Sequence, residues 1–125
     1  MILIPISNGE LLDKLTILEI KKEQIFDKIK LEKVQNEYSL LKKIYFEKSL
    51  DKYNNLYNQL KKVNKILWKI EDDIREKEYK KEFDEEFIKL ARSVYIENDN
   101  RFQLKDKINK LSKSSIHEVK SYNRF

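Results

Sequence analysis

The chain has 125 residues, which predicts a single domain (residues 1–125), and its single glycine and single proline favour long helices. Charged residues make up 39% of the sequence and hydrophobic residues 40%, a balance that excludes a disordered chain and leaves a net charge of +5. Because there is no cysteine and only one histidine, disulfides and thiolate chemistry are excluded, zinc is not expected and a cytoplasmic location is predicted.

The glycine and the proline both lie in the stretch PISNGELLDKL, which we expect to begin the first helix. Ser7 and Glu10 form the S-x-x-E pattern of a capping box, in which each side chain bonds the other's free backbone amide. The helix is predicted over residues 8–26. Ile17 and Ile20 lie opposite its main apolar face, so both sides should be covered, either by other helices or by a second chain.

Apolar residues spaced alternately three and four apart predict three further helices, over residues 28–47, 51–78 and 84–112. Short connections make consecutive helices antiparallel. The predicted fold is therefore all-α, an antiparallel bundle of about four long helices or a pair of long hairpins, with coiled-coil-like seams. Residues 113–125 form a polar tail. We also expect a homodimer, because a second chain is one way to cover the other apolar side of the first helix.

Polar side chains lie on or beside the apolar seams of the third and fourth predicted helices, and they form a candidate ligand site. The set comprises Asn64, Trp68, Glu71, Arg75, Tyr95, Asn98, Arg101 and Lys105, with Lys14 of the first helix at its edge. Buried charges must be paired or must bind something. Cations outnumber the one glutamate, which suits a phosphate or carboxylate ligand, and the two aromatic rings can stack on a sugar or base. The alternative is a structural network in which Glu71 pairs with Arg101 or Lys105.

A divalent metal site is a weaker alternative. The stretches IEDD and ENDN place Glu71, Asp72 and Asp99 on two helices, and Mg²⁺ prefers oxygen ligands of this kind. All-helical nucleotide pyrophosphatases bind magnesium through E-x-x-E followed by E-x-x-D, a spacing that is not reproduced here. Solvated surface charges are the simpler interpretation, so no metal or other cofactor is expected.

The stretches PISNGELLDKLTILEIKKEQI, VNKILWKIEDDIRE, FIKLARSVYIENDNRFQLKDKIN and the closing EVKSY resemble, in this order, an uncharacterised family of small helical bacterial and phage proteins. The family is catalogued as a domain of unknown function, and the resemblance brings no catalytic residues. The family's tail usually reads E-E-K-S-Y, and Val119 replaces the second Glu here. The stretch from Asn64 to Asp72, N-x-x-L-W-x-x-E-D, is similar to a second uncharacterised helical family. Both are associated with surface-polysaccharide gene clusters, which implies a sugar-nucleotide or sugar-phosphate context.

ELLDKLTILEI also resembles the first helix of all-helical chorismate mutases, which hold a dicarboxylate with inward cations. Lys21, Arg75, Arg101 and Lys105 are the matching cations here.

Three functions follow as alternatives. The first is a protein that binds, or acts on, a small anionic ligand such as a sugar nucleotide or sugar phosphate. The second is a helical assembly or adaptor protein without catalytic activity. The third is nucleic-acid binding, which is the least expected because charges of both signs are interleaved along the chain. No stretch approaches the roughly 20 apolar residues of a membrane span, and His117 is expected at the surface.

Overall fold

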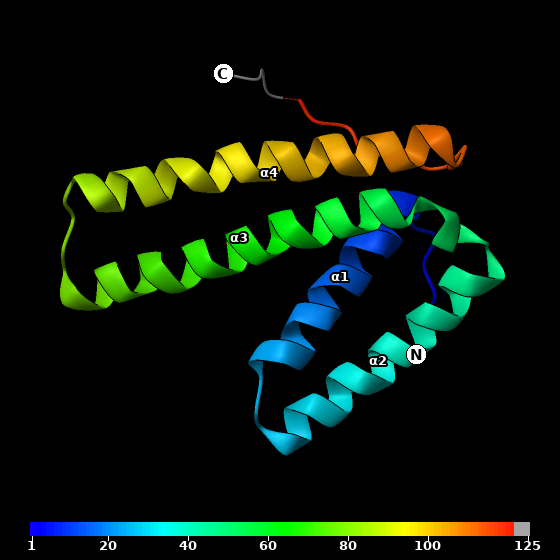
Figure 1. Cartoon of the computed structure of the whole chain (residues 1–125), viewed down its shortest axis with the longest axis horizontal. Coiled ribbons are helices and arrows are strands. Elements are labelled where there is room, and N and C mark those ends of the chain that lie inside the picture. The colour runs from blue at the N-terminus through cyan, green and yellow to red at the C-terminus, as the bar shows by residue number, and fades with distance from the viewer. Residues whose placement is uncertain (122–125) are drawn as a thin grey trace.

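The computed structural model describes residues 1–121, and this part of the chain is all-α, as predicted (Figure 1). Its elements are α1 (Asn8–Gln24), α2 (Lys28–Glu47), the 3₁₀ turn η1 (Leu50–Tyr53), α3 (Asn54–Lys80) and α4 (Glu85–Leu111). The largest difference from the sequence prediction is the start of the third helix, because residues 50–53 form the separate 3₁₀ turn. None of the described helices combines the length and the apolar character that crossing a bilayer requires.

The helices form two antiparallel hairpins of unequal length (Figure 1). The α3–α4 hairpin is the longer, since each of its helices has 27 residues, against 17 in α1 and 20 in α2. α1 packs against α2, α3 and α4, whereas α2 packs chiefly on α1. The outer half of the α3–α4 hairpin therefore projects beyond the rest of the molecule as a pair of helices (Figure 1).

Side-chain caps explain where the helices begin. The Oγ of Ser7 accepts a hydrogen bond from the amide of Glu10 at 3.1 Å, which is one half of the predicted capping box. The other half is not formed, because the Glu10 carboxylate accepts from the Nζ of Lys105 at 2.8 Å instead. Asp27 and Asp84 begin α2 and α4, each accepting from an amide of the first turn.

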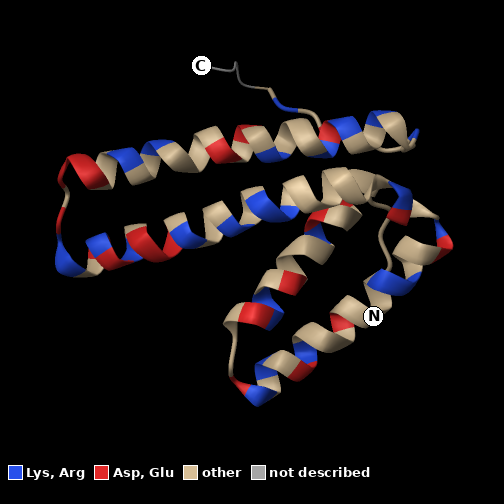
Figure 2. Ribbon diagram, in the orientation of Figure 1, with Lys and Arg blue, Asp and Glu red and all other residues tan. Residues whose placement is uncertain are grey.

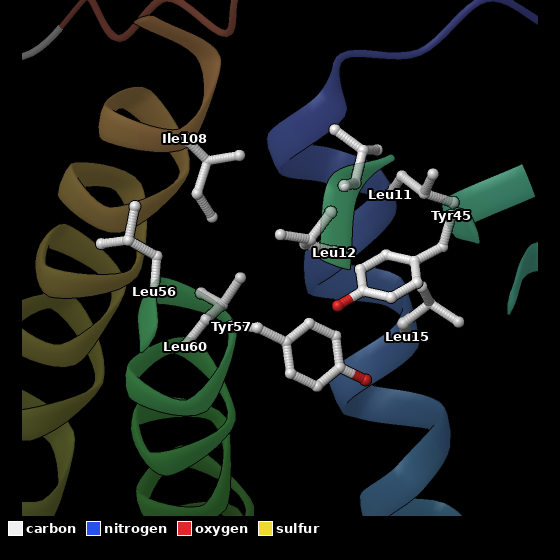
Figure 3. Packing of buried hydrophobic residues seen from close by; sticks show 9 residues of the cluster. Leu11, Leu12, Leu15, Tyr45, Leu56, Tyr57, Leu60 and Ile108 are labelled. Carbon is white, nitrogen blue, oxygen red and sulfur yellow. The ribbon is translucent and has the colours of Figure 1, made fainter. Parts of the chain in front are cut away.

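The hydrophobic core lies where α1 meets α2 and the inner halves of α3 and α4 (Figure 3). It is made of the buried side chains Leu11, Leu12, Leu15, Tyr45, Leu50, Leu56, Tyr57, Leu60 and Ile108. Tyr45 and Tyr57 join α2 to α3, with ring centroids 5.7 Å apart. A fully buried leucine stabilises a fold by roughly 1.5–3 kcal/mol, and α1 supplies three of them, so α1 is the central helix of the core.

The second apolar side of α1 is covered within the chain. Ile20 is only 1% exposed, and it lines a cleft together with the half-buried Ile17. The other walls of this cleft belong to α3 and α4. The argument for a homodimer from the first helix therefore fails, because α3 and α4 occupy the place of the second chain that the sequence allowed.

The single glycine lies where α1 packs on α4. The Gly9 amide donates a hydrogen bond to the Oδ1 of Asn109 at 2.7 Å, and both residues are buried. A Cβ atom on Gly9 would lie 2.6 Å from the backbone oxygen of Lys105 and 3.0 Å from Asn109 Oδ1. The φ angle of Gly9 is not positive, so this position needs glycine for its small size and not for its backbone freedom.

We predict that Gly9→Ala lowers the free energy of unfolding by about 1–3 kcal/mol, the usual cost of overpacking a close contact. The loss is expected even though alanine favours a helix over glycine by up to about 1 kcal/mol. Urea denaturation followed by circular dichroism measures it. The matched control Gln103→Ala, on an exposed position of α4, should stay within about 0.5 kcal/mol of the original protein. Unchanged or higher stability of Gly9→Ala would contradict so close an approach of the two helices.

Candidate functional site

A cleft opens between the second half of α1 and the α3–α4 hairpin. Its volume is about 540 Å³, which falls within the range of small-molecule sites. The residues that line it are Ile17, Ile20, Asn64, Leu67, Trp68, Glu71, Asp72, Arg75, Val94, Asn98 and Arg101. Apolar side chains of α1 thus face a mixed wall of charged, amide and aromatic groups from α3 and α4.

The cleft brings together six of the nine candidate residues that the sequence indicates. These six are Asn64, Trp68, Glu71, Arg75, Asn98 and Arg101. On α3 they are spaced four, three and four apart, so they form one stripe along the helix beside its apolar seam. Because α3 and α4 pack along their seams, this stripe lies across from the corresponding polar positions of α4.

The other three candidate residues lie outside the cleft. Tyr95 is 44% exposed, and its position is rotated by about 100° around α4 from the cleft-lining Val94. Lys14 is exposed and borders a separate groove beside residues 1–6. Lys105 is 5% exposed and belongs to an ion-pair network at the start of α1.

The two arginines of the cleft differ in their partners. Arg75 Nε donates to Glu71 Oε2 at 3.3 Å, and both side chains are exposed. The predicted pairing of Glu71 with Arg101 or Lys105 is therefore wrong. Glu71 pairs instead with Arg75, which lies one turn further along the same helix. Arg101 has neither a hydrogen bond nor an ion pair with any residue in the described range 1–121. Its guanidinium group thus borders the cleft without a carboxylate bound to it.

A buried polar network supports the floor of the cleft. The Nδ2 of Asn64 donates to the Oδ1 of Asp13 and to the Oγ1 of Thr16, each at 2.8 Å. Thr16 in turn donates to the backbone oxygen of Asp13 at 2.7 Å. Burial raises the pKa of Asp13, although the hydrogen bond from Asn64 and the charges of Arg101 and Lys105 oppose this shift. The amide of Asn64 therefore fixes α3 to α1, a structural role beside any contact with a ligand.

Lys105 is surrounded by carboxylates. Its Nζ lies 2.8 Å from Glu10 Oε2, 2.7 Å from Glu118 Oε2 and 3.9 Å from Asp13 Oδ2. Burial alone would lower the pKa of Lys105, but the hydrogen bonds to Glu10 and Glu118, together with the charges of Asp13 and Glu10, raise it overall. The structural-network interpretation therefore holds for Lys105. Its partners come from α1 and the tail, and Glu71 is not among them.

The tail packs on the helices it follows, at least as far as Glu118. The Oγ of the buried Ser114 accepts from the Asn8 amide at 3.1 Å, and the Asn8 side chain donates to Ser112 Oγ at 2.8 Å. These bonds tie the end of α4 to the beginning of α1. His117 is exposed, as expected. Residues 122–125 of the predicted tail lie outside the described residues.

The metal alternative does not fit the geometry. Glu71 and Asp72 line the cleft, but Asp99 is buried elsewhere on α4. Within the described part of the chain, no three His, Asp or Glu side chains are grouped so that they hold a metal ion. Glu71, Asp72 and Asp99 therefore do not form the magnesium site that their types allow.

We predict that Lys105→Met lowers the free energy of unfolding by about 3–5 kcal/mol, because it removes the cation shared by the buried Asp13 and the half-buried Glu10 and Glu118. The matched control is Lys107→Met at an exposed position of the same helix, which should change stability by less than about 0.5 kcal/mol. Chemical denaturation of both variants at neutral pH measures the difference. Equal stabilities of the two variants would show that the network does not stabilise the fold.

The contact of Glu118 with Lys105 should depend on pH. Burial raises the pKa of Glu118, but the hydrogen bonds and charges of Lys105 and Lys120 together outweigh this effect and the net pKa is lowered. A lowered carboxyl pKa stabilises the fold above the unfolded value of about 4.3, and that contribution is lost as the pH falls through the lower folded value. We therefore predict that Glu118→Gln is less stable than the original protein at pH 7, and that this difference vanishes in acid. A stability difference that is constant between pH 7 and pH 3 would contradict this.

Comparison with known sequences identifies one family. A family described as "Family of unknown function (DUF6165)" matches residues 2–125. Comparison with curated proteins gave no match, and comparison with solved structures gave none. The family description carries no activity, so the function must be argued from the cleft itself. The chain belongs to this family of unknown function, DUF6165.

Proposed function

We propose that the chain binds a small phosphate-bearing sugar, either a sugar phosphate or a sugar nucleotide, in the cleft between α1, α3 and α4. The observation that carries this proposal is the Arg101 guanidinium group, which borders the cleft and has no bonded partner within residues 1–121. The charge of the half-buried Arg101 acts on the Asp13 carboxylate without a bond between them, and the planar fork of arginine matches the geometry of phosphate oxygens.

Arg75 supplies a second guanidinium group to the same cleft. Its present partner is the exposed Glu71, and an exposed pair spaced i, i+4 contributes only about 0.3–0.5 kcal/mol. A phosphate group can therefore displace the carboxylate at small cost, since charge-assisted bonds to phosphate are among the strong ones. Arginines from two facing helices would then hold one phosphate or diphosphate between them.

The remaining lining suits a sugar or a base. The half-buried Trp68 lines both the cleft and a neighbouring cavity of about 350 Å³, which makes its indole ring a candidate for stacking. Glu71, Asp72 and Asn98 offer oxygen acceptors to hydroxyl groups. The two arginines and the two carboxylates of the lining balance in charge. This balance favours a ligand with both a phosphate and hydroxyls over a bare polyanion.

The choice of a sugar draws further support from the resemblance of the Asn64 to Asp72 stretch to proteins associated with surface-polysaccharide gene clusters. The proposal concerns binding. A reaction on the bound ligand would have to use Glu71 or Asp72, which are the carboxylates of the lining. We also propose a cytoplasmic location, in keeping with a sequence that has no cysteine.

An exposed apolar segment supports the alternative of an assembly protein. On that basis we propose that the chain forms a homodimer. Residues 1–4 are apolar and strongly exposed. Nucleic-acid binding gains no comparable support, because basic and acidic residues alternate along the helices (Figure 2).

We predict that a sugar phosphate or a sugar nucleotide raises the melting temperature, and that Arg101→Gln weakens its binding about 10- to 100-fold. The reason is that a hydrogen bond to a charged group contributes about 1.5–3 kcal/mol. Thermal shift and isothermal titration calorimetry with glucose 1-phosphate, UDP-glucose and inorganic phosphate measure this. The matched control Arg92→Gln, at an exposed position of α4 outside the cleft, should leave binding unchanged.

In the same titrations, Trp68→Ala should weaken the binding of the sugar-containing ligands more than that of inorganic phosphate, because only the former stack on the ring. Three outcomes would contradict the proposal. The first is that none of the three compounds stabilises the protein. The second is that Arg101→Gln binds the ligands as tightly as Arg92→Gln does. The third is that Arg101→Gln destabilises the free protein as strongly as Lys105→Met, which would make Arg101 a structural residue.

A further inference from the structure

The segment before α1 exposes a run of apolar side chains. Met1, Ile2, Leu3 and Ile4 are 93%, 88%, 82% and 70% exposed, and residues 1–6, here called the arm, are not helical. Single exposed apolar residues are normal on a protein surface, but a run of four is not. Contiguous apolar surface of this kind marks a place where a protein contacts another surface.

The arm borders an apolar groove that it does not fill. The groove has a volume of about 630 Å³ and lies between the arm, the first turns of α1 and the second half of α2. Apart from the arm, its apolar lining comprises Leu11, Leu40, Leu41, Ile44 and Leu50. Leu40 and Ile44 are still 44% and 37% exposed. The chain therefore presents an uncovered apolar arm and an open apolar groove side by side.

We propose that two copies of this chain dimerise by exchanging arms, so that the arm of each copy lies in the groove of the other. This inference rests on the homodimer proposed above and names the surface through which it forms. It does not depend on the ligand-binding cleft. An arm and a groove on the same chain suit a twofold interface, in which each copy offers the same two surfaces to its partner.

The area of such an interface is sufficient for a stable dimer. A buried aliphatic side chain removes on the order of 100 Å² of apolar surface from water. The four side chains of one arm, with the groove surface they cover, thus account for about 800 Å². A twofold dimer contains this contact twice and buries about 1,600 Å², which is the standard size of a specific interface.

The backbone of the arm is also available for pairing. Within the described range, residues 1–6 take part in no backbone hydrogen bond. Pro5 has no amide hydrogen, and it favours an extended conformation at Ile4. An extended apolar segment with unpaired backbone groups is a template for pairing with a second chain.

A membrane surface is the main rival for the arm, since Lys14 and Lys48 also line the groove and would attract anionic lipids. A flat lipid surface covers an arm but does not enter a groove between that arm and α2. A second copy covers both surfaces at once. The two occupants are therefore separable by variants that alter the groove alone.

The test uses one arm variant, Ile2→Lys, and one groove variant, Leu40→Glu, measured by light scattering after size exclusion. We expect the original protein at twice its chain mass of 15.3 kDa, and each variant monomeric at micromolar concentration. Burying a lone charge in the contact should raise the dimer dissociation constant about 100-fold. The matched control is Phe26→Lys, which alters an 89% exposed side chain outside the groove and should stay dimeric. Circular dichroism verifies that all three variants are folded.

An equal mixture of Ile2→Lys and Leu40→Glu should form dimers again. The mixed dimer has one unaltered contact and one in which the new lysine faces the new glutamate. Failure of this rescue, or a groove variant that stays dimeric, would overturn arm exchange while leaving a homodimer through another surface. If the unaltered protein is monomeric, both arm exchange and the proposed homodimer are overturned. A monomer that binds phosphatidylglycerol vesicles, and loses this binding in Ile2→Lys but not in Leu40→Glu, would assign the arm to lipid.

Discussion

The close packing of α1 on α4 at Gly9 determines how the rest of the molecule is arranged. Without a Cβ at this position, the two backbones approach closely enough for the Gly9 amide to bond Asn109 and for the Glu10 side chain to reach Lys105. The far end of α1 diverges from the α3–α4 hairpin, as Figure 1 shows. The cleft lies in this divergence, against Ile17 and Ile20. The absence of a side chain at Gly9 thus allows the close polar contacts between α1 and α4.

Polar contacts and apolar seams have different roles in this fold. Leucine and isoleucine spaced three and four apart favour the association of helices, but such repeats alone also permit a shift by one turn. A shift of α1 would separate Asp13 from Asn64 and Lys105 from Glu10, leaving buried polar groups without partners. We infer that these contacts define the register of α1 against α3 and α4, whereas the apolar core supplies most of the stability.

The sequence predicts each helix and groups six residues of the cleft, because periodicity reports which side chains share a face. It does not predict which faces meet. Lys105 lies in the angular range of the seam, and only the folded chain shows that its partners are Glu10, 95 residues away, and Glu118 in the tail. For the same reason the second apolar side of α1 suggested another chain, although α3 and α4 cover it. Asp13 is also absent from the set of candidate site residues. The available signal was its spacing of four and seven residues from Ile17 and Ile20, which places it on the second apolar side of α1.

The cleft and the arm groove use different sides of α1, so the two proposed contacts do not compete. Leu11 lines the groove and Ile20 lines the cleft. Nine residues separate them, which is about two and a half helical turns, and they therefore point in opposite directions. Arm exchange therefore uses a surface of α1 other than the one that lines the cleft. α1 also carries Asp13, whose contacts hold it to α3 and α4. A partner bound at the start of α1 therefore contacts the same helix that forms one wall of the cleft.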